Sequence, residues 1–378
     1  MNNLGVYIHI PFCVQKCLYC DFYSLPGALD KAKEYIDKAC GQSEQLSAFC
    51  RDRVCDSIYV GGGTPSILPP EEISRLIGTV RRCFGATETC EITVECNPGT
   101  VSRESFEVYK SCGVNRISLG VQSYRDETLA RIGRIHRFSD ALDAVDAAHA
   151  AGIGNVSCDL MYALPGQTER EIVDAFERLS ARGIRHVSLY GLKIEENTPF
   201  AGMKLRLPDE EEQAKTYLSS VALFEKHGFY QYEISNFAVR GYESRHNLRY
   251  WNREEYLGIG PAAHSFFDGV RFCSGRDLEG YLANGDFTLS SPFYVEKERI
   301  SQKEAREEEL MLSLRLTSGY SLDLLYANTA NRKQCELYVH QLMRSGLAVV
   351  SDGRLILTPE GMLVSNSVIS DLLLLYGA

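Results

Sequence analysis

The chain has 378 residues, of which 44% are hydrophobic and 24% are charged, as in ordinary globular proteins. A single hydrophobic core seldom grows to this length, so we expect one large domain with an additional module. The net charge of −10 argues against a nucleic-acid partner, no run reaches the ~18 apolar residues of a membrane span, and the first residues lack a signal-peptide pattern, so we expect a cytoplasmic protein.

Strands and helices alternate through the first half of the sequence. Short apolar runs predict strands at residues 6–10, 57–60, 92–96, 116–121, 155–161 and 186–192. Helical patterns lie between them, up to about residue 49 and at 71–84, 102–113, 139–152 (with Ser139 as N-cap) and 168–183. This alternation is typical of an α/β fold with a parallel sheet. The units are too few for a closed barrel of ~250 residues, so we predict a partial (β/α)6 TIM-type barrel over residues 1–207.

Polar or glycine-rich segments follow the predicted strands. They are the cysteines after 6–10, Gly61–Thr64 after 57–60, Glu95 at the end of 92–96, Gln122 after 116–121, and Asp159 in 155–161. Because functional residues in such folds lie at the carboxyl ends of strands, we expect these side chains to gather at one edge of the sheet.

The second half follows a different pattern. Residues 208–300 read as a mixed middle extension with a loop containing HNLRYWN. Residues 301–378 predict a winged-helix-like α+β module, in which two helices precede a hairpin around Asp352-Gly353 and a last helix. This module contains seven Lys or Arg against nine Asp or Glu, so we expect a packing or lid role rather than DNA binding.

Three cysteines lie close together in FCVQKCLYCDF: Cys13, Cys17 and Cys20. The other ten cysteines are expected to be buried or incidental thiols. Four cysteines would close a structural zinc site or a fully ligated cluster, whereas three can hold three irons of a 4Fe–4S cluster and leave the fourth iron open. A zinc site completed by His9 is the alternative.

An ordered set of motifs resembles the radical S-adenosylmethionine superfamily, in the branch around oxygen-independent coproporphyrinogen oxidase. The motifs are YIHIPFC with the cysteine triplet, GGGTP, ECNP, NRISLGVQS, GRIH and DLMYALPGQT. HNLRYW and GIGPAAHSF resemble segments of the haem chaperones of that branch. The resemblance covers nearly the whole chain.

The resemblance implies a 4Fe–4S cluster on Cys13, Cys17 and Cys20, with S-adenosylmethionine on the open iron. The implied contacts to S-adenosylmethionine come from Tyr7, Phe12, Gly62, Gly63, Thr64, Glu95, Gln122, Arg134 and Asp159. Glycines let backbone groups approach the ammonium, and Glu95 faces the cofactor's charge. By the same resemblance, Arg134 is expected to pair with the carboxylate, and Gln122 and Asp159 are expected to bind the ribose. Tyr7 is expected to lie near the methionine, and Phe12 is expected to shield the cluster.

One departure from the oxidase pattern bears on function. The oxidase has a further cysteine two residues after the third ligand, and Phe22 stands there in this chain. This argues against porphyrinogen decarboxylation and favours the haem chaperones, which bind haem and deliver it to apo-haemoproteins, respiratory ones being one class of recipient. An oxygen-independent coproporphyrinogen III oxidase and a radical methyltransferase stay as alternatives, so whether the protein is an enzyme stays open and no catalytic residue is assigned.

The HNLRYW segment supplies the candidate haem site. His246 is the candidate axial ligand to haem iron, with Tyr250 and Trp251 as aromatic neighbours for the porphyrin. A structural histidine in a packed loop is an equally ordinary interpretation. His264, in GPAAHS, is a second candidate ligand.

Overall fold

The computed structural model describes residues 2–376, and this part of the chain divides into two compact units. Unit 1 comprises the described residues up to Asp209 together with Glu254–Arg299. Unit 2 comprises Glu210–Arg253 together with the described residues from Ile300 onward. The three-domain division suggested by the sequence, 1–207, 208–300 and 301–378, stays a prediction.

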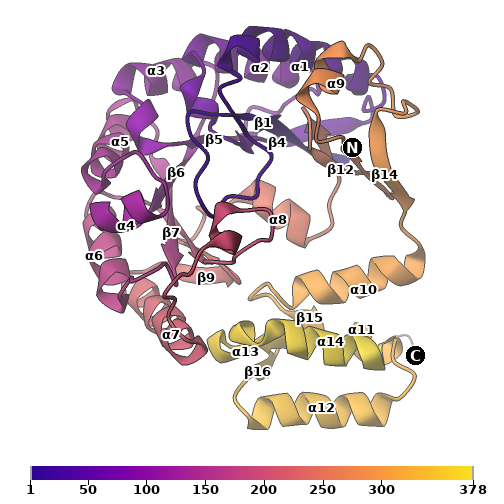
Figure 1. The fold of residues 1–378 in the computed structure, drawn as a ribbon. Helices are drawn as coiled ribbons and strands as arrows, with labels where there is room; N and C mark the ends of the chain where they lie inside the picture. The colour runs from indigo at the N-terminus through magenta and orange to yellow at the C-terminus, as the bar shows by residue number, and fades with distance from the viewer. Residues whose placement is uncertain (1, 377–378) are drawn as a thin grey trace. The chain divides into compact units, whose positions relative to one another are not determined.

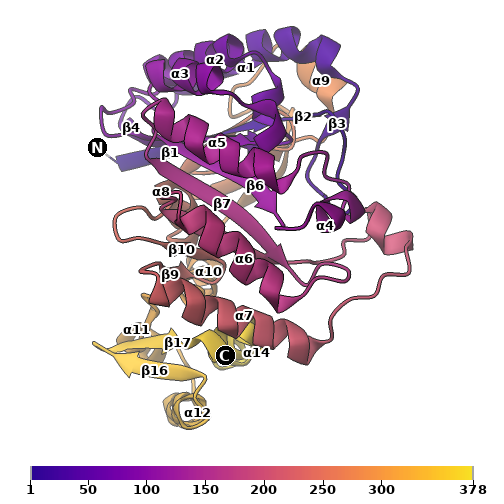
Figure 2. The same cartoon turned by 90° about the vertical axis from the view of Figure 1, so that its left-hand side faces the viewer.

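Parallel strands form the centre of unit 1. In spatial order they are β1 (Asn2–Ile10), β4 (Arg53–Gly62), β5 (Glu91–Cys96), β6 (Arg116–Gln122), β7 (Asn155–Tyr162) and β8 (His186–Gly191). The helices that cover their outer face are α1 (Ala32–Ser47), α2 (Pro70–Cys83), α3 (Arg103–Ser111), α5 (Phe138–Ala150) and α6 (Glu169–Ser180) (Figures 1 and 2). The short helix α4 (Asp126–Arg131) lies beyond the carboxyl ends of the strands (Figure 2). The predicted strand–helix alternation is confirmed.

Local sequence explains these elements. The parallel strands carry apolar side chains that are fully buried, such as Val6, Ile8 and Val60, because helices cover this sheet. Helix α6 begins with a capping box between Thr168 and Glu171. The predicted N-cap of α5 is wrong: the helix starts at Phe138, before Ser139, and the Asp140 carboxylate accepts a hydrogen bond from the N–H of Arg137, 2.8 Å away.

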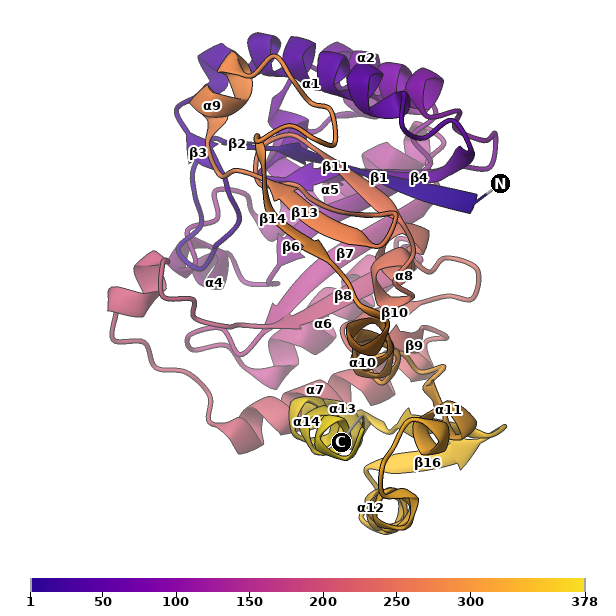
Figure 3. The same cartoon turned by 90° about the vertical axis from the view of Figure 1, so that its right-hand side faces the viewer.

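The barrel is open, and the sheet continues past β1 in a way that the sequence did not suggest. Strand β11 (Tyr256–Ile259) pairs parallel with the side of β1 opposite β4, so the parallel strands of unit 1 do not close on themselves. Antiparallel strands β12 (His264–Phe267), β13 (Val270–Ser274) and β14 (Tyr294–Arg299) follow, with α9 (Leu278–Ala283) between the last two (Figure 3).

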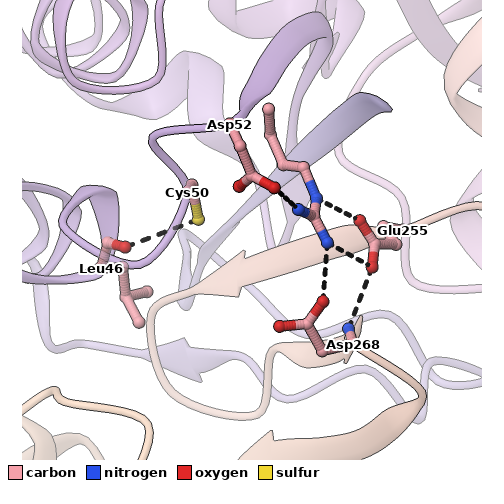
Figure 4. A network of polar contacts seen from close by, with 6 residues as sticks. Leu46, Cys50, Asp52, Glu255 and Asp268 are labelled. Atoms are coloured by element: carbon pink, nitrogen blue, oxygen red, sulfur yellow. Dashed lines mark hydrogen bonds and ion pairs between the residues drawn. The ribbon is translucent and has the colours of Figure 1, made fainter. Parts of the chain in front are cut away.

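An arginine on β4 ties this extension to the central strands. Arg53 donates to both carboxylate oxygens of Glu255, at 2.7 and 3.2 Å, and to Asp268 at 2.6 Å (Figure 4). The backbone N–H of Asp268 donates to Glu255 in turn, at 3.0 Å. Glu255 precedes β11 and Asp268 lies between β12 and β13, so one guanidinium fixes both turns of the extension.

Short connecting elements complete unit 1. They are β2 (Phe12–Cys13), β3 (Leu25–Pro26), and the 3-10 turns at Leu29–Lys31, Pro65–Ile67, Pro98–Thr100 and Pro199–Gly202. Strands β2 and β3 pair in parallel and bracket the loop that contains Cys17 and Cys20.

Unit 2 consists of a first segment and a C-terminal module. The first segment contains α7 (Glu210–Lys226), β9 (Tyr230–Glu233), β10 (Asn236–Ala238) and α8 (Arg245–Trp251). The module contains α10 (Gln302–Ser313), β15 (Tyr320–Ser321), α11 (Leu322–Ala327), α12 (Arg332–Arg344), β16 (Ala348–Ser351), β17 (Arg354–Leu357), α13 (Pro359–Leu363) and α14 (Ser365–Leu375).

The predicted hairpin of the winged-helix-like module is confirmed. Strands β16 and β17 join through Asp352 and Gly353, whose φ values of 50° and 72° fit a two-residue hairpin turn, and β15 pairs with β17. Among the described residues, no helix has both the length and the apolar character that a membrane crossing requires.

Candidate functional site

The cysteine loop is anchored at its middle to the carboxyl end of the sheet. The N–H of Leu18 donates to the carbonyl of Ile132 at 3.1 Å, and the Leu18 carbonyl accepts from the N–H of Phe200 at 3.1 Å. Leu18 and Tyr19 also pack against a buried apolar cluster that includes Ile132 and Phe200. Cys13 is buried, whereas Cys17 and Cys20 are partly exposed. The three thiols therefore lie in one anchored loop, and two of them are accessible to a ligand.

The glycine turn that follows β4 lies against the start of this loop. The N–H groups of Gly63 and Thr64 donate to the carbonyls of Ile10 and Phe12, both at 2.8 Å. The Thr64 hydroxyl lies 3.5 Å from the sulfur of Cys13. The predicted GGGTP segment and the cysteine segment therefore meet, although about 50 residues separate them in sequence.

Close neighbours explain the glycines. A Cβ on Gly61 would lie 2.8 Å from the Glu95 carboxyl carbon, and a Cβ on Gly62 would lie 2.6 Å from the His9 ring. Gly62 also has φ of +108°, and a Cβ on Gly63 would collide with the Phe12 carbonyl oxygen. Backbone conformation or packing thus favours glycine at 62 and 63 whatever they contact in a ligand, whereas a Cβ at 61 would displace the Glu95 carboxyl group.

His9 is committed to hydrogen bonds inside the protein. Its Nε2 donates to the carbonyl oxygen of Tyr23 at 2.7 Å, so Nδ1 accepts from the Tyr7 hydroxyl at 3.0 Å. Burial lowers the pKa of His9 to about 4, which keeps the ring neutral. With both nitrogens engaged, this geometry offers no lone pair to a zinc ion in the cysteine loop, which weakens the zinc alternative.

Two carboxyl groups lie on strands β5 and β7, which are separated in the sheet by β6. Glu95 accepts hydrogen bonds from the Tyr59 hydroxyl at 2.8 Å and from the N–H of Gly62 at 3.1 Å. Burial, with a contribution from the charge of Asp159, raises the pKa of Glu95 to about 7. Burial also raises the pKa of Asp159, which accepts from the Ser118 hydroxyl at 3.2 Å. A cationic ligand would favour the ionised form of both groups.

Gln122 and Arg134 come together above Gly120. Gln122 adopts a φ of 68°, which is uncommon for a residue with a side chain. The amide nitrogen of Gln122 and a guanidinium nitrogen of Arg134 lie 3.1 and 3.3 Å from the position that a Cβ on Gly120 would take. Arg134 also donates to the hydroxyl of Tyr19 at 2.9 and 3.2 Å. The sequence interpretation missed Tyr19, although its place between Cys17 and Cys20 was an available signal.

A small pocket lies between the cysteine loop, Thr64 and Arg134, and Glu95, Gln122 and Asp159 are not part of its lining. Its lining includes Cys17, Thr64, Asn97 and Arg134. The side-chain oxygen of Asn97 is buried and has no hydrogen-bond partner in the described structure. Leaving such an acceptor unpaired costs about 1–3 kcal/mol, so a donor from a bound ligand would offset this cost.

Two predicted aromatic contacts lie apart from the pocket lining. The Tyr7 ring stacks on Tyr59 with centroids 6.2 Å apart. Phe12 is fully buried and packs edge-on against Tyr35 of α1, with centroids 5.4 Å apart. The ring of Phe12 thus belongs to the core under α1. The cofactor roles of Tyr7 and Phe12 stay predictions.

The HNLRYW segment lies in unit 2 and is the helix α8, whereas the sequence suggested a loop. His246 is fully buried, and its Nε2 lies 2.8 Å from the Tyr250 hydroxyl one turn later. The two rings meet edge-on, with centroids 5.1 Å apart. His264, by contrast, is an exposed residue of β12 in unit 1. The haem-ligand roles of His246 and His264 stay predictions.

Known proteins resemble this chain over its full length. Residues 7–179 match the model of the radical SAM superfamily, and residues 300–364 match that of the HemN C-terminal domain. The chain is 34% identical to the "Heme chaperone HemW" of Bacillus subtilis over 375 residues, 96% of this chain and 97% of that protein. The HemW of Escherichia coli is 39% identical over 298 residues, 78% of each chain.

One solved structure shares the fold. It is described as coproporphyrinogen III oxidase (HemN) from Escherichia coli, a radical SAM enzyme, and it matches with a TM-score of 0.83. The match covers 98% of this chain and 90% of that one at 20% identity, which supports the shared fold alone. On the full-length similarity to the curated relatives, the chain belongs to the HemW family of the radical SAM superfamily.

Proposed function

We propose that this protein is a haem chaperone, which binds haem and passes it to apo-haemoproteins. The observation that carries the proposal is the similarity over nearly the whole length to relatives described as heme chaperones, at 34% identity in both Bacillus subtilis and Lactococcus lactis. Two regions of the chain enter the proposal: the cysteine loop with the strand ends of unit 1, and helix α8 of unit 2.

In this proposal the residues at the strand ends hold a 4Fe–4S cluster and S-adenosylmethionine. The donor set fits, because three cysteines lie in one anchored loop with no fourth thiol among their neighbours in the motif. The unpaired Asn97 oxygen and the carboxyl groups of Glu95 and Asp159 suit a ligand that carries N–H donors and positive charge. When bound, the cluster with S-adenosylmethionine supplies one-electron chemistry.

Arg134 and Gln122 supply the complementary donors. Arg134 offers a forked guanidinium to a carboxylate, and the Gln122 amide beside it is able to bond a hydroxyl. Tyr19 orients the guanidinium through two hydrogen bonds. In this proposal these side chains orient the bound S-adenosylmethionine.

Phe22 supports the chaperone over the oxidase. It stands where the oxidase pattern has a further cysteine, and its side chain is 67% exposed. Its carbonyl oxygen accepts from Lys16 at 3.1 Å, within the cysteine loop itself. A phenyl ring at this position provides neither a thiolate nor a proton.

His246 is the axial ligand to haem iron in this proposal. Because its Nε2 shares a hydrogen bond with Tyr250 and the ring is buried, ligation through that nitrogen requires this bond to break and the ring to become accessible. A protein that must release its ligand again benefits from such a competing closed state, which lowers the apparent affinity.

Haem titration together with a product assay tests the proposal. The purified full-length protein should bind haem with a Soret band and should leave coproporphyrinogen III unconverted under reducing, anaerobic conditions with S-adenosylmethionine. Absence of haem binding combined with formation of protoporphyrinogen IX would replace the chaperone by the oxidase. A methylated product would replace it by a methyltransferase.

A further inference from the structure

Three side chains with metal-binding atoms lie together on the antiparallel strands of unit 1. They are His264 at the start of β12, Cys273 on β13 and Glu296 on β14, and their ligand atoms all lie within 4.8 Å of one another. His264 and Cys273 are directly paired across the two strands. Next to Cys273 the register of β13 with β14 shifts. None of the three belongs to the cysteine-loop site.

We propose that His264, Cys273 and Glu296 form a second metal site, which takes a divalent transition-metal ion of the zinc type. Imidazole, thiolate and carboxylate are the ligand types of Zn²⁺, whereas Mg²⁺ and Ca²⁺ prefer oxygen ligands alone. Three protein ligands leave a fourth tetrahedral position to water or to another ligand, as in zinc sites that act on a substrate.

The burial of the three groups suits such a site. Cys273 is 5% exposed, whereas His264 and Glu296 are exposed. The thiol is therefore the buried ligand of the site, and the other two ligands lie at the protein surface. Cysteine binds metal ions as the thiolate, so metal binding at Cys273 would release the thiol proton.

The segment after β13 links the proposed site to the residues that follow the cysteine triplet. Arg276, three residues after Cys273, donates to the carbonyl oxygen of Asp21 at 2.9 Å, and Asp21 follows Cys20. The N–H of Leu278 donates to the Tyr23 hydroxyl at 2.9 Å. The segment that follows β13, the strand of the proposed thiolate ligand, therefore contacts residues just after the cysteine triplet.

Zinc analysis of the cluster-loaded protein tests the proposal. Anaerobic reconstitution fills Cys13, Cys17 and Cys20, which would otherwise bind zinc themselves. After equilibration with Zn²⁺ and dialysis, we expect one retained zinc per chain. Zinc X-ray absorption should then show one sulfur at ~2.3 Å and nitrogen or oxygen ligands at ~2.0–2.2 Å.

Substitutions make the test specific. Cys273→Ser should remove the sulfur shell, whereas Cys50→Ser, at a thiol of matching burial (4%) elsewhere in unit 1, should leave it unchanged. His264→Ala and Glu296→Gln change exposed side chains, so these variants should fold and lower zinc affinity at least about tenfold. No zinc retained by the unsubstituted protein, a sulfur shell that survives Cys273→Ser, or unchanged affinity in both surface variants would each overturn the proposal.

Discussion

The cysteine-loop site of unit 1 and helix α8 of unit 2 differ in whether their polar side chains already have hydrogen-bond partners within the protein. At the first site, a small pocket lies beside the cysteine loop, the Asn97 oxygen has no partner, and two carboxyl groups have raised pKa values. In α8, His246 is fully buried and is hydrogen-bonded to Tyr250 within the same helix.

The difference shows what each region needs before it binds a ligand. We expect the groups at the strand ends, which the sheet holds in place, to need less rearrangement on binding a ligand, which lowers the cost of binding. His246 lies in a closed state that ligation through Nε2 must open. We therefore expect substitutions in unit 1 to cause a large loss of cluster content or of S-adenosylmethionine affinity. Substitutions in α8 that shift the closed state should change haem affinity moderately.

The largest expected effect is the loss of the cluster. Cys17→Ala should abolish the about four irons and four sulfides per chain that anaerobic reconstitution of a 4Fe–4S site gives, because two thiolates do not hold the cluster. Iron and sulfide analysis measures this. Cys83→Ala, at a partly exposed cysteine on α2, is the control and should keep the full content. Stoichiometric zinc without iron in protein purified anaerobically would rule the cluster out.

Removal of all three loop cysteines separates the two regions. Since α8 belongs to unit 2, a protein that lacks Cys13, Cys17 and Cys20 should still take up haem and show a Soret band. Spectroscopic titration of this triple variant beside the unsubstituted protein measures it. Loss of haem binding in the folded triple variant would mean that the cysteines contribute to the haem site.

The next effect concerns the affinity for S-adenosylmethionine. Arg134→Ala should weaken binding by about 2–5 kcal/mol, tens- to thousands-fold, and leave the iron content intact, because it removes a charge-assisted pair with the carboxylate. Calorimetry on the reconstituted protein measures this. Tyr19→Phe, which keeps the guanidinium and removes two of its hydrogen bonds, should cost far less. Equal affinity in Arg134→Ala and the parent would show that Arg134 does not contact the ligand.

A pH dependence should follow from Glu95. Burial raises its pKa to about 7, so the group is a carboxylate above this pH and a neutral acid below it. If the carboxylate faces the positive charge of S-adenosylmethionine, affinity should fall as pH drops, about tenfold from pH 8 to pH 6. Glu95→Gln should bind more weakly and lose most of this dependence. If the affinity of both proteins falls equally with pH, a group other than Glu95 causes the pH dependence.

The smallest effect tests the closed state of α8. Tyr250→Phe removes the hydrogen bond to His246 Nε2, so it should make haem ligation easier and raise haem affinity about two- to tenfold. His246→Ala should instead weaken binding and shift the haem spectrum. Spectroscopic haem titration of both variants measures these effects. An unchanged haem spectrum in His246→Ala would show that another group is the axial ligand.

Sequence patterns predicted the fold of unit 1 well because they are local. The strand runs and the helical periodicity lie within single elements, and the carboxyl ends of parallel strands must share one edge, so Gly63, Glu95 and Gln122 were expected at the site. The motif order also specified the family. The extension β11–β14 was missed because the pairing of β11 with β1 joins residues about 250 positions apart, and YLGI alone is too short a signal.

Side-chain partnerships could not be predicted in the same way. The contacts of Arg134 with Tyr19 and of Glu95 with Tyr59 depend on three-dimensional proximity that no spacing rule encodes. The grouping of His264, Cys273 and Glu296 depends on strand pairing and on a register shift that a sequence does not display. Likewise, the HNLRYW motif pointed to His246 but did not reveal that its ring is enclosed.

Transfer of haem from the loaded protein to an apo-haemoprotein tests the central claim most directly. The full-length protein, loaded with one haem and separated from free haem, should convert apo-myoglobin to the holo form, with loss of its own Soret band and gain of the acceptor's band. Transfer should exceed that from an equal amount of haem bound to serum albumin, a passive carrier. A loaded protein that releases no haem to the acceptor, or releases it no faster than the passive carrier, would contradict the account.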